Sequence, residues 1–172
     1  GLAKCKSHDK FIPPSVRHAP TEDRSAVLQG RMNTDGTADT RGYASFTSVS
    51  ERLARGVQEL TWSLGAKATL TKGPSYLNGV RHRDHYDVYI QPAGKFKCFR
   101  LERKQSRVKG YMHEDLCRRV RSIEPVGKMD CRCIRIDDLD HLYITDDYIV
   151  THNTDSLLMD FAQHVGQGYG SD

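Results

Sequence analysis

An apolar stripe at helical spacing constrains the fold of this chain of 172 residues more than any other feature. The stripe consists of Leu53, Val57, Leu60 and Leu64. Residues at these intervals lie along one face of a single helix. Ser48 and Glu51 have the spacing of a capping box in front of the stripe, and Gly65 follows it. The sequence therefore predicts a helix between Ser48 and Gly65.

Alternating patterns on both sides of this helix predict strands. The segment "HYDVYIQP" alternates apolar with polar residues, which is the period of a half-buried strand. Its predicted inward-facing residues are Tyr86, Val88 and Ile90. The segments "GYASFTS" and "AKATLTK" are also predicted to be extended.

A second helix is predicted at about residues 22–34. Thr21 can cap its start, Glu22 and Asp23 favour the positive end of the helix dipole, and Gly36 stops it. The order helix–strand–helix–strand–strand, followed by a basic region and a β-rich end, predicts an α+β fold.

Composition limits the environment in which this chain works. The net charge is +4, no apolar run has the length of a membrane span, and the first residues lack the apolar core of a signal peptide. We therefore expect a soluble cytoplasmic protein with no membrane partner. The five cysteines are an odd number, which argues against a disulfide framework. Cys131 and Cys133 have no second pair that would complete a zinc site with them.

One carboxylate stands where its own helix disfavours it. Asp35 falls at the C-terminal end of the predicted 22–34 helix, where the macrodipole opposes a negative charge. This placement suggests a compensating cation such as a divalent metal, although a solvated Asp-Gly turn is the alternative. Ala26 and Gly30 lie four residues apart on the same helix and form a face of small residues that another helix can approach closely.

The segment "LQGRMNTDG", within the order of elements from Lys10 to Ile90, resembles the LAGLIDADG homing endonucleases, in particular the second endonuclease half found inside inteins. The resemblance implies an αββαββ endonuclease half over residues 1–110, with Asp35 as a Mg²⁺ ligand and Lys10 linked to catalysis. It also implies that the Ala26/Gly30 face packs against a matching helix of the other half. Asn33 stands where the motif has its first acid, and Arg31 replaces an apolar residue. With one motif copy, the chain is half of an endonuclease unless it dimerises.

A basic run follows the last predicted strand of this half. It contains Lys95, Lys97, Arg100, Arg103, Lys104 and Arg107. These cations alternate with Phe96, Phe99 and Tyr111, which suits a surface that tracks the phosphates of double-stranded DNA. A solvated charged face is the alternative.

The sequence "VTHNT" near the end of the chain indicates a second kind of chemistry, backbone cleavage at an asparagine. The side-chain nitrogen of Asn153 can attack its own carbonyl and release the downstream segment, and the adjacent His152 can protonate the leaving nitrogen. Thr154 then offers a hydroxyl that can carry an acyl group. Two strands, "CRCIRID" and "HLYITDDYIV", are predicted to precede this site.

This region resembles the C-terminal splicing region of inteins. The resemblance implies an all-β C-terminal piece of an intein splicing domain over residues 111–153, with His141 assisting Asn153 and no cofactor for splicing. It also implies a missing N-terminal intein half and a host segment that begins at Thr154 and covers residues 154–172. That host segment resembles the sequence after the Walker A lysine of phage terminase large subunits.

Cys133 has the position of the internal nucleophile of a minority class of inteins, which pairs such a cysteine with Thr after the Asn. The flanking Arg132 and Arg135 would lower its pKa if they lie close in space. Cys131 is the alternative thiol, and a buried apolar role for Cys133 is the other interpretation.

Two further functions remain open from sequence. One is a DNA-binding module that no longer cuts or splices, and the other is a free-standing homodimeric endonuclease. Gly1 in place of Met argues against the second.

Overall fold

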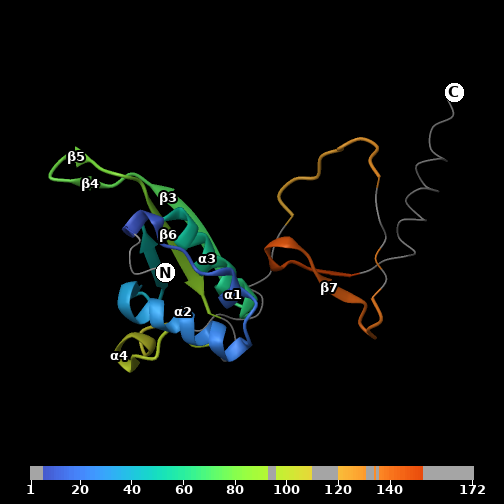
Figure 1. Ribbon diagram of the computed structural model, residues 1–172, viewed down its shortest axis with the longest axis horizontal. Coiled ribbons are helices and arrows are strands. Elements are labelled where there is room, and N and C mark those ends of the chain that lie inside the picture. Colours follow the sequence, from blue (N-terminus) through green and yellow to red (C-terminus); the bar gives the residue numbers. More distant parts are fainter. Residues whose placement is uncertain (1–5, 93–95, 110–119, 131–133, 135, 153–172) are drawn as a thin grey trace. The chain divides into compact units, whose positions relative to one another are not determined.

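The computed structural model describes residues 6–92, 96–109, 120–130, 134 and 136–152 (Figure 1). The chain divides into two compact units, residues 1–119 (unit 1) and residues 120–172 (unit 2). Residues 110–119 lie outside the described part, so the domain boundary expected at residue 110 stays a prediction. No helix in the described ranges has the length and apolar character needed to cross a membrane.

Unit 1 has the αββαββ order expected from the sequence, running from α2 to β6, with a small hairpin inserted before the last strand (Figure 1). Its elements are η2 (Ser7–Asp9), α1 (Pro14–Arg17), α2 (Thr21–Asp35), β1 (Gly36–Ala38), β2 (Ala44–Ser48), α3 (Glu51–Ser63), β3 (Lys67–Gly73), β4 (Tyr76–Leu77), β5 (Val80–Arg81), β6 (His85–Gln91) and α4 (Glu102–Gln105).

Four of these strands form one antiparallel sheet in the order β1-β2-β6-β3. In the register of the central strands, Phe46 of β2 and Leu70 of β3 both lie opposite Val88 of β6. Val88 and Ile90 are buried while Tyr89 between them is 47% exposed. The half-buried strand predicted from "HYDVYIQP" is therefore confirmed.

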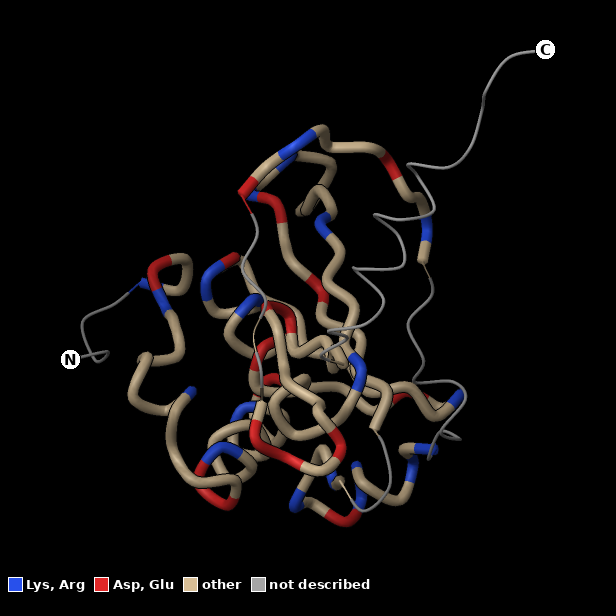
Figure 2. The backbone as a smooth tube through the Cα atoms, turned by 90° about the vertical axis from the view of Figure 1, so that its right-hand side faces the viewer, with Lys and Arg blue, Asp and Glu red and all other residues tan. Residues whose placement is uncertain are grey.

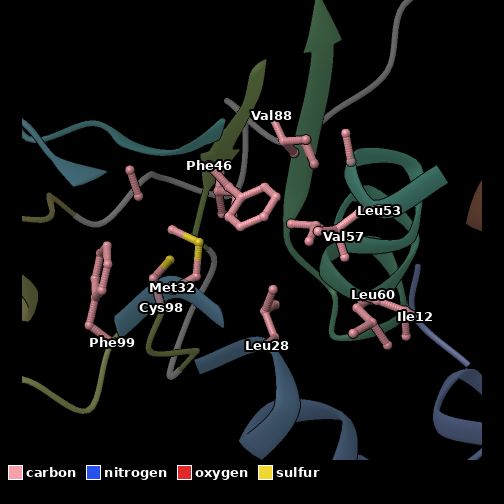
Figure 3. Close-up of a cluster of buried hydrophobic side chains, with 14 of the residues drawn as sticks. Ile12, Leu28, Met32, Phe46, Leu53, Val57, Leu60, Val88, Cys98 and Phe99 are labelled. Carbon is pink, nitrogen blue, oxygen red and sulfur yellow. The ribbon is translucent and has the colours of Figure 1, made fainter. Parts of the chain in front are cut away.

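The two long helices bury their apolar faces against one side of this sheet (Figure 3). The stripe on α3 is buried as predicted at Leu53, Val57 and Leu60, and Leu64 is partly buried against the same cluster. From α2, Leu28 and Met32 are fully buried. Fully burying an apolar side chain of this size contributes about 1.5–3 kcal/mol, so this cluster holds the helices on the sheet.

The helix starts differ from the predicted caps. The N-cap of α2 is Pro20, and Thr21 is the first helical residue, whose hydroxyl accepts a hydrogen bond from Arg24. The N-cap of α3 is Ser50, whose Oγ accepts from the Leu53 N–H at 3.2 Å. Ser48 was expected in that role but stands two residues earlier, where its Oγ accepts from the Ser50 N–H at 3.0 Å. The capping-box spacing favoured Ser48 because Glu51 follows it by three residues, whereas Leu53 holds that place after Ser50.

The hairpin β4–β5 turns through Asn78 and Gly79, which both have positive φ angles, 52° and 79°. A two-residue loop with this backbone matches the twist of the flanking strands, and Asn-Gly is the pair that adopts it most readily. The hairpin carries the exposed apolar side chains of Tyr76, Leu77 and Val80.

Unit 2 contains, in its described residues, one two-stranded sheet and one short 3-10 helix. These elements are β7 (Leu142–Ile144), η4 (Asp146–Tyr148) and β8 (Val150–His152). The segment "HLYITDDYIV" was predicted as one strand, but it folds back on itself because Asp147 and Tyr148 adopt positive φ angles of 59° and 54°. In "CRCIRID", the described residues Ile134, Ile136 and Asp137 lie outside any strand.

Candidate functional site

Asp35 is the last residue of α2, and Gly36 both ends this helix and begins β1. The Asp35 side chain is exposed, and none of the described residues gives it a hydrogen bond or an ion pair. The Gly36 N–H donates to the Met32 carbonyl, and a Cβ at residue 36 would lie 2.6 Å from that oxygen. Glycine therefore follows Asp35 because the backbone of Met32 leaves no room for a side chain.

The cation that compensates the end of α2 in the structure is Lys104. Its Nζ donates to the carbonyl oxygens of Met32 at 3.3 Å, Asn33 at 2.9 Å and Gly36 at 2.6 Å. Carbonyls at a helix C-terminus have no partner within the helix, and a lysine side chain can satisfy them. Lys104 was predicted as a DNA contact, but its ammonium group is partly buried and bonded to the protein, so a phosphate contact by this residue stays a prediction.

The segment 96–105 is held along α2 by side-chain amides. Asn33 Oδ1 accepts from the backbone N–H groups of Arg100 at 3.1 Å and Leu101 at 3.3 Å. Gln29 donates to the Lys97 carbonyl and accepts from Arg100 Nε. Asn33, which replaces the first acid of the motif, therefore has a structural role that uses its side-chain oxygen.

Four of the predicted DNA contacts in the basic run are exposed to solvent. Figure 2 marks the Lys and Arg positions along the backbone in blue. These exposed residues are Lys97, Arg100, Arg103 and Arg107. Lys95 lies outside the described residues. The aromatic residues between them point elsewhere, since Phe99 is fully buried and Phe96 packs against the same core. The charged part of the predicted surface is present in the structure, whereas its described aromatic side chains belong to the core.

Lys10, predicted to assist catalysis, is half-buried before α1. Its carbonyl accepts a hydrogen bond from Ser50 Oγ at 2.6 Å, which ties this segment to the start of α3. No described hydrogen bond or ion pair connects Lys10 with Asp35.

The sheet face away from the helices is polar and was not identified from the sequence. Near the start of β6 it carries a hydrogen-bond chain in which Thr47 Oγ1 donates to Asp87 at 2.5 Å, His85 Nε2 lies 3.2 Å from Asp87, and Ser75 Oγ lies 3.1 Å from His85 Nδ1. The alternation in "HYDVYIQP" could have revealed this face, because a half-buried strand also has an outward half.

An open cleft of about 430 Å³ lies at one end of this sheet. Its polar lining includes Arg41, Tyr43, Ser45, Thr69, Tyr89 and Gln91. Hydrogen bonds from the Tyr43 N–H and from Arg41 lower the pKa of the Asp39 carboxyl at its rim. Gln91 Oε1 is buried without a hydrogen-bond partner among the described residues. The cleft therefore combines a cation, hydroxyls and aromatic rings on a surface that no described element covers.

In unit 2 the structure brings the two predicted splicing histidines together. The register of β7 and β8 sets Leu142 opposite His152, and the rings of His141 and His152 meet edge to face with centroids 6.1 Å apart. The Nδ1 atom of His141 lies 3.2 Å from the Ile136 carbonyl, which can only accept, so Nδ1 carries the proton. In the neutral ring this leaves Nε2 as an acceptor. Cys133, Asn153 and Thr154 lie outside the described residues.

The described residues contain no group of three or more His, Cys, Asp or Glu side chains that could hold a metal ion. Asp35 can therefore offer one carboxylate, an oxygen ligand of the type that Mg²⁺ prefers, to a site that needs further ligands. Asp35 therefore fits one ligand position of a Mg²⁺ site.

A sheet covered by helices on one face and open and polar on the other, with an exposed carboxylate at a helix end, defines an α+β domain. The chain belongs to the family of LAGLIDADG-like domains, whose model matches residues 22–109. Domains of this family bind double-stranded DNA, are usually DNA endonucleases and generally use divalent metal ions.

Two curated relatives are both replicative DNA helicases, DnaB. The protein from Mycobacterium intracellulare is 28% identical over 158 residues, which cover 89% of this chain and 27% of the relative. The protein from Synechocystis sp. is 32% identical over 100 residues, which cover 55% of this chain and 11% of the relative. The chain thus spans about a quarter or less of the length of the relatives it matches.

Proposed function

We propose that residues 1–110 form half of a site-specific DNA homing endonuclease. The observation that carries this proposal is the exposed carboxylate of Asp35 at the junction of α2 and β1, in a domain of the LAGLIDADG-like family. The proposed reaction is hydrolysis of a phosphodiester bond in double-stranded DNA.

Asp35 would hold Mg²⁺ together with a carboxylate from the missing half. A divalent ion bound there supplies stabilisation of the charge that develops on the phosphate oxygens. The second helix would pack on the face of Ala26 and Gly30, where Gly30 is exposed and has nothing within 4 Å of the position of a Cβ. Small residues at this face allow the two helix ends, and so the two carboxylates, to come close.

The open sheet face and the exposed cations would bind the DNA. Strands can read base edges in the major groove, and the outward polar residues of β2, β3 and β6 offer hydrogen-bond donors and acceptors for that purpose. Lys97, Arg100, Arg103 and Arg107 would contact phosphates, which adds affinity without sequence preference.

The test is Asp35→Asn in a precursor with its N-terminal half restored. We expect loss of Mg²⁺-dependent nicking with unchanged DNA affinity and unchanged splicing, because the two proposed sites are separate. Asp23→Asn is the matched control, since Asp23 is an exposed carboxylate in the first turn of the same helix. Normal nicking by the Asp35 variant would refute the metal role, and loss of splicing would show that Asp35 is structural.

We further propose that residues 111–153 are the C-terminal splicing module of an intein. The contact between His141 and His152 supports this, because cyclisation of Asn153 needs a proton donor beside the scissile bond. The side-chain nitrogen of Asn153 would attack its own carbonyl carbon, the bond to Thr154 would break, and His152 would protonate the released nitrogen, with His141 assisting.

Asn153→Ala should block release of the segment after residue 153 in the restored precursor. Unchanged release would exclude Asn cyclisation.

Cys133→Ser should abolish thioester formation at the upstream junction, measured by hydroxylamine cleavage, while Cys131→Ala serves as the control. In the proposed sequence of steps the Cys133 thiolate attacks the carbonyl carbon of the upstream junction, the amide C–N bond breaks, and its nitrogen leaves as a protonated amine. The Thr154 hydroxyl then loses its proton and attacks the thioester, which releases the Cys133 thiolate before Asn153 cyclises.

The host of this intein would be an ATPase, and two candidates stand on different observations. The two DnaB relatives support a replicative helicase. The segment after Thr154 supports a terminase-like protein by its resemblance. The coding sequence upstream of residue 1 and downstream of residue 172 discriminates between them.

Two alternative functions have specific support. A DNA-binding module that no longer cuts fits the use of Asn33 as an anchor for Arg100 and Leu101 in place of an acid. It predicts DNA binding without metal-dependent nicking in the restored precursor. A free-standing homodimer fits the open space at Gly30, and sedimentation of the isolated chain on its DNA target would reveal two copies per duplex.

A further inference from the structure

The ammonium group of Lys104 binds the backbone on both sides of Asp35. Two of the carbonyls it contacts, those of Met32 and Asn33, precede Asp35 in the chain, and the third, that of Gly36, lies after it. A single cation therefore fixes the last turn of α2 and the first residue of β1 at once. Asp35 is the residue between the fixed points.

Lys104 is itself held in place by its neighbours. The α4 turn that carries it is tied to α2 through Asn33 Oδ1, and the Phe99 N–H donates to Gln105 Oε1 at 3.0 Å. The buried ring of Phe99 lies 5.5 Å from Lys104 Nζ, so the cation also rests against an aromatic face. A side chain with this many partners has a defined position.

The bonds of Lys104 go to the backbone of the helix end, whereas the Asp35 carboxylate remains unpaired among the described residues. Lys104 thus fixes the backbone beside Asp35 without forming an ion pair with its carboxylate. Such an arrangement suits a carboxylate that must face a ligand while keeping its negative charge available. Carboxylates in reacting sites depend on placement within about 0.5 Å, which is supplied by residues that do not touch the substrate.

We propose that Lys104 is a positioning residue for Asp35, which sets the direction of the carboxylate by holding the carbonyls of Met32, Asn33 and Gly36. This role rests on the proposed endonuclease function and is an alternative to the DNA contact predicted for Lys104 from sequence.

The experiment compares Lys104→Met, Lys104→Arg and Arg103→Met. Arg103 is the matched control, because it is an exposed cation on the same turn. The first measurement is amide hydrogen exchange of the present chain. We expect residues 33–37 to exchange about tenfold faster in Lys104→Met, since charge-assisted bonds to that turn are lost, with no change in Arg103→Met.

The second measurement is DNA binding and cutting by the restored precursor. Lys104→Met should lower kcat about tenfold or more while the DNA Kd and its salt dependence stay unchanged, because misplacing a reacting group affects the chemical step. Lys104→Arg keeps the charge and several donors and should recover part of the kcat. A phosphate contact would instead reduce the slope of log Kd against log salt by about one, as expected for Arg103→Met.

Unchanged exchange at residues 33–37 in Lys104→Met overturns the proposal, and so does a reduced salt slope with a normal kcat. If Lys104→Met does not fold, Lys104→Arg provides the test. Wild-type hydrogen exchange at residues 33–37 together with a lost kcat in Lys104→Arg would exclude a positioning role. A wild-type precursor that binds DNA but does not cut refutes the endonuclease function alone, and the exchange measurement still tests the hold on Asp35.

Discussion

Removal of the Ser50 hydroxyl should destabilise unit 1 far more than removal of the Ser48 hydroxyl. Ser50 is 1% exposed, and its Oγ both accepts from the Leu53 N–H and donates to the Lys10 carbonyl. Loss of the cap costs about 1 kcal/mol, and loss of the second bond about another 1 kcal/mol. We therefore expect Ser50→Ala to lower the free energy of unfolding by about 2 kcal/mol. For Ser48→Ala, which loses one bond at a half-buried site, we expect about 0.5 kcal/mol.

Urea unfolding of the full chain, followed by fluorescence of Trp62, measures both changes. Trp62 is the single tryptophan, and it lies in α3, where its Nε1 donates to the Ala68 carbonyl. A lower midpoint with an unchanged m-value reports a change in stability alone. An equal or larger effect of Ser48→Ala would refute the assignment of Ser50 as the cap and would restore the capping box predicted from spacing.

Three further outcomes test other parts of unit 1. Gly30→Ala should raise the free energy of unfolding of the isolated chain, measured in urea, by about 0.5–1 kcal/mol, because replacing a helical glycine that has open space around it by alanine stabilises the helix. In the restored precursor the added methyl group should weaken the association of the two endonuclease halves. Tighter association would contradict the proposed helix contact. Gly36→Ala should cost about 1–3 kcal/mol, since its Cβ would meet the Met32 backbone, and an unchanged midpoint would disprove that crowding. Burial raises the pKa of the Cys98 thiol from its usual value of 9.0 to about 12. Between these two pH values the unfolded chain loses a proton that the folded chain keeps, so the free energy of unfolding should fall as pH rises from 9.0 to about 12. Peptide mapping after treatment with a thiol reagent at a pH of about 8 should find Cys98 modified only in denaturant.

The fold of unit 1 could be predicted in large part because its signals are periodic. The stripe on α3 and the alternation in β6 each specify both an element and its buried face, and both are confirmed. The short elements carried no such signal. β1 has three residues and β4 and β5 have two each, so neither alternation nor length distinguishes them from loops.

The candidate site was predicted at Asp35 but not in its surroundings. The position of Asp35 at the end of a helix can be inferred from local sequence, whereas its connection to Lys104 joins residues about 70 apart through tertiary packing. Charge alone placed Lys104 with the exposed cations of its run. Similarly, the sequence identified His141 and His152 through a resemblance. Their ring contact depends on the turn at Asp147 and Tyr148, whose positive φ angles are uncommon for residues other than glycine.

The strand order β1-β2-β6-β3 has a consequence for how unit 1 assembles. The outer pairings β1–β2 and β3–β6 connect neighbouring segments, but the central pairing joins Thr47 to Asp87, 40 residues apart in sequence. Closing so long a loop costs entropy before any contact compensates for it, so the two hairpins should form early and meet late. The polar sheet face extends across the pairing of β2 with β6, which forms last. A nascent or partly unfolded chain therefore has two half-surfaces and no complete one, and its affinity for a large polar ligand should appear only at the final, cooperative step of folding.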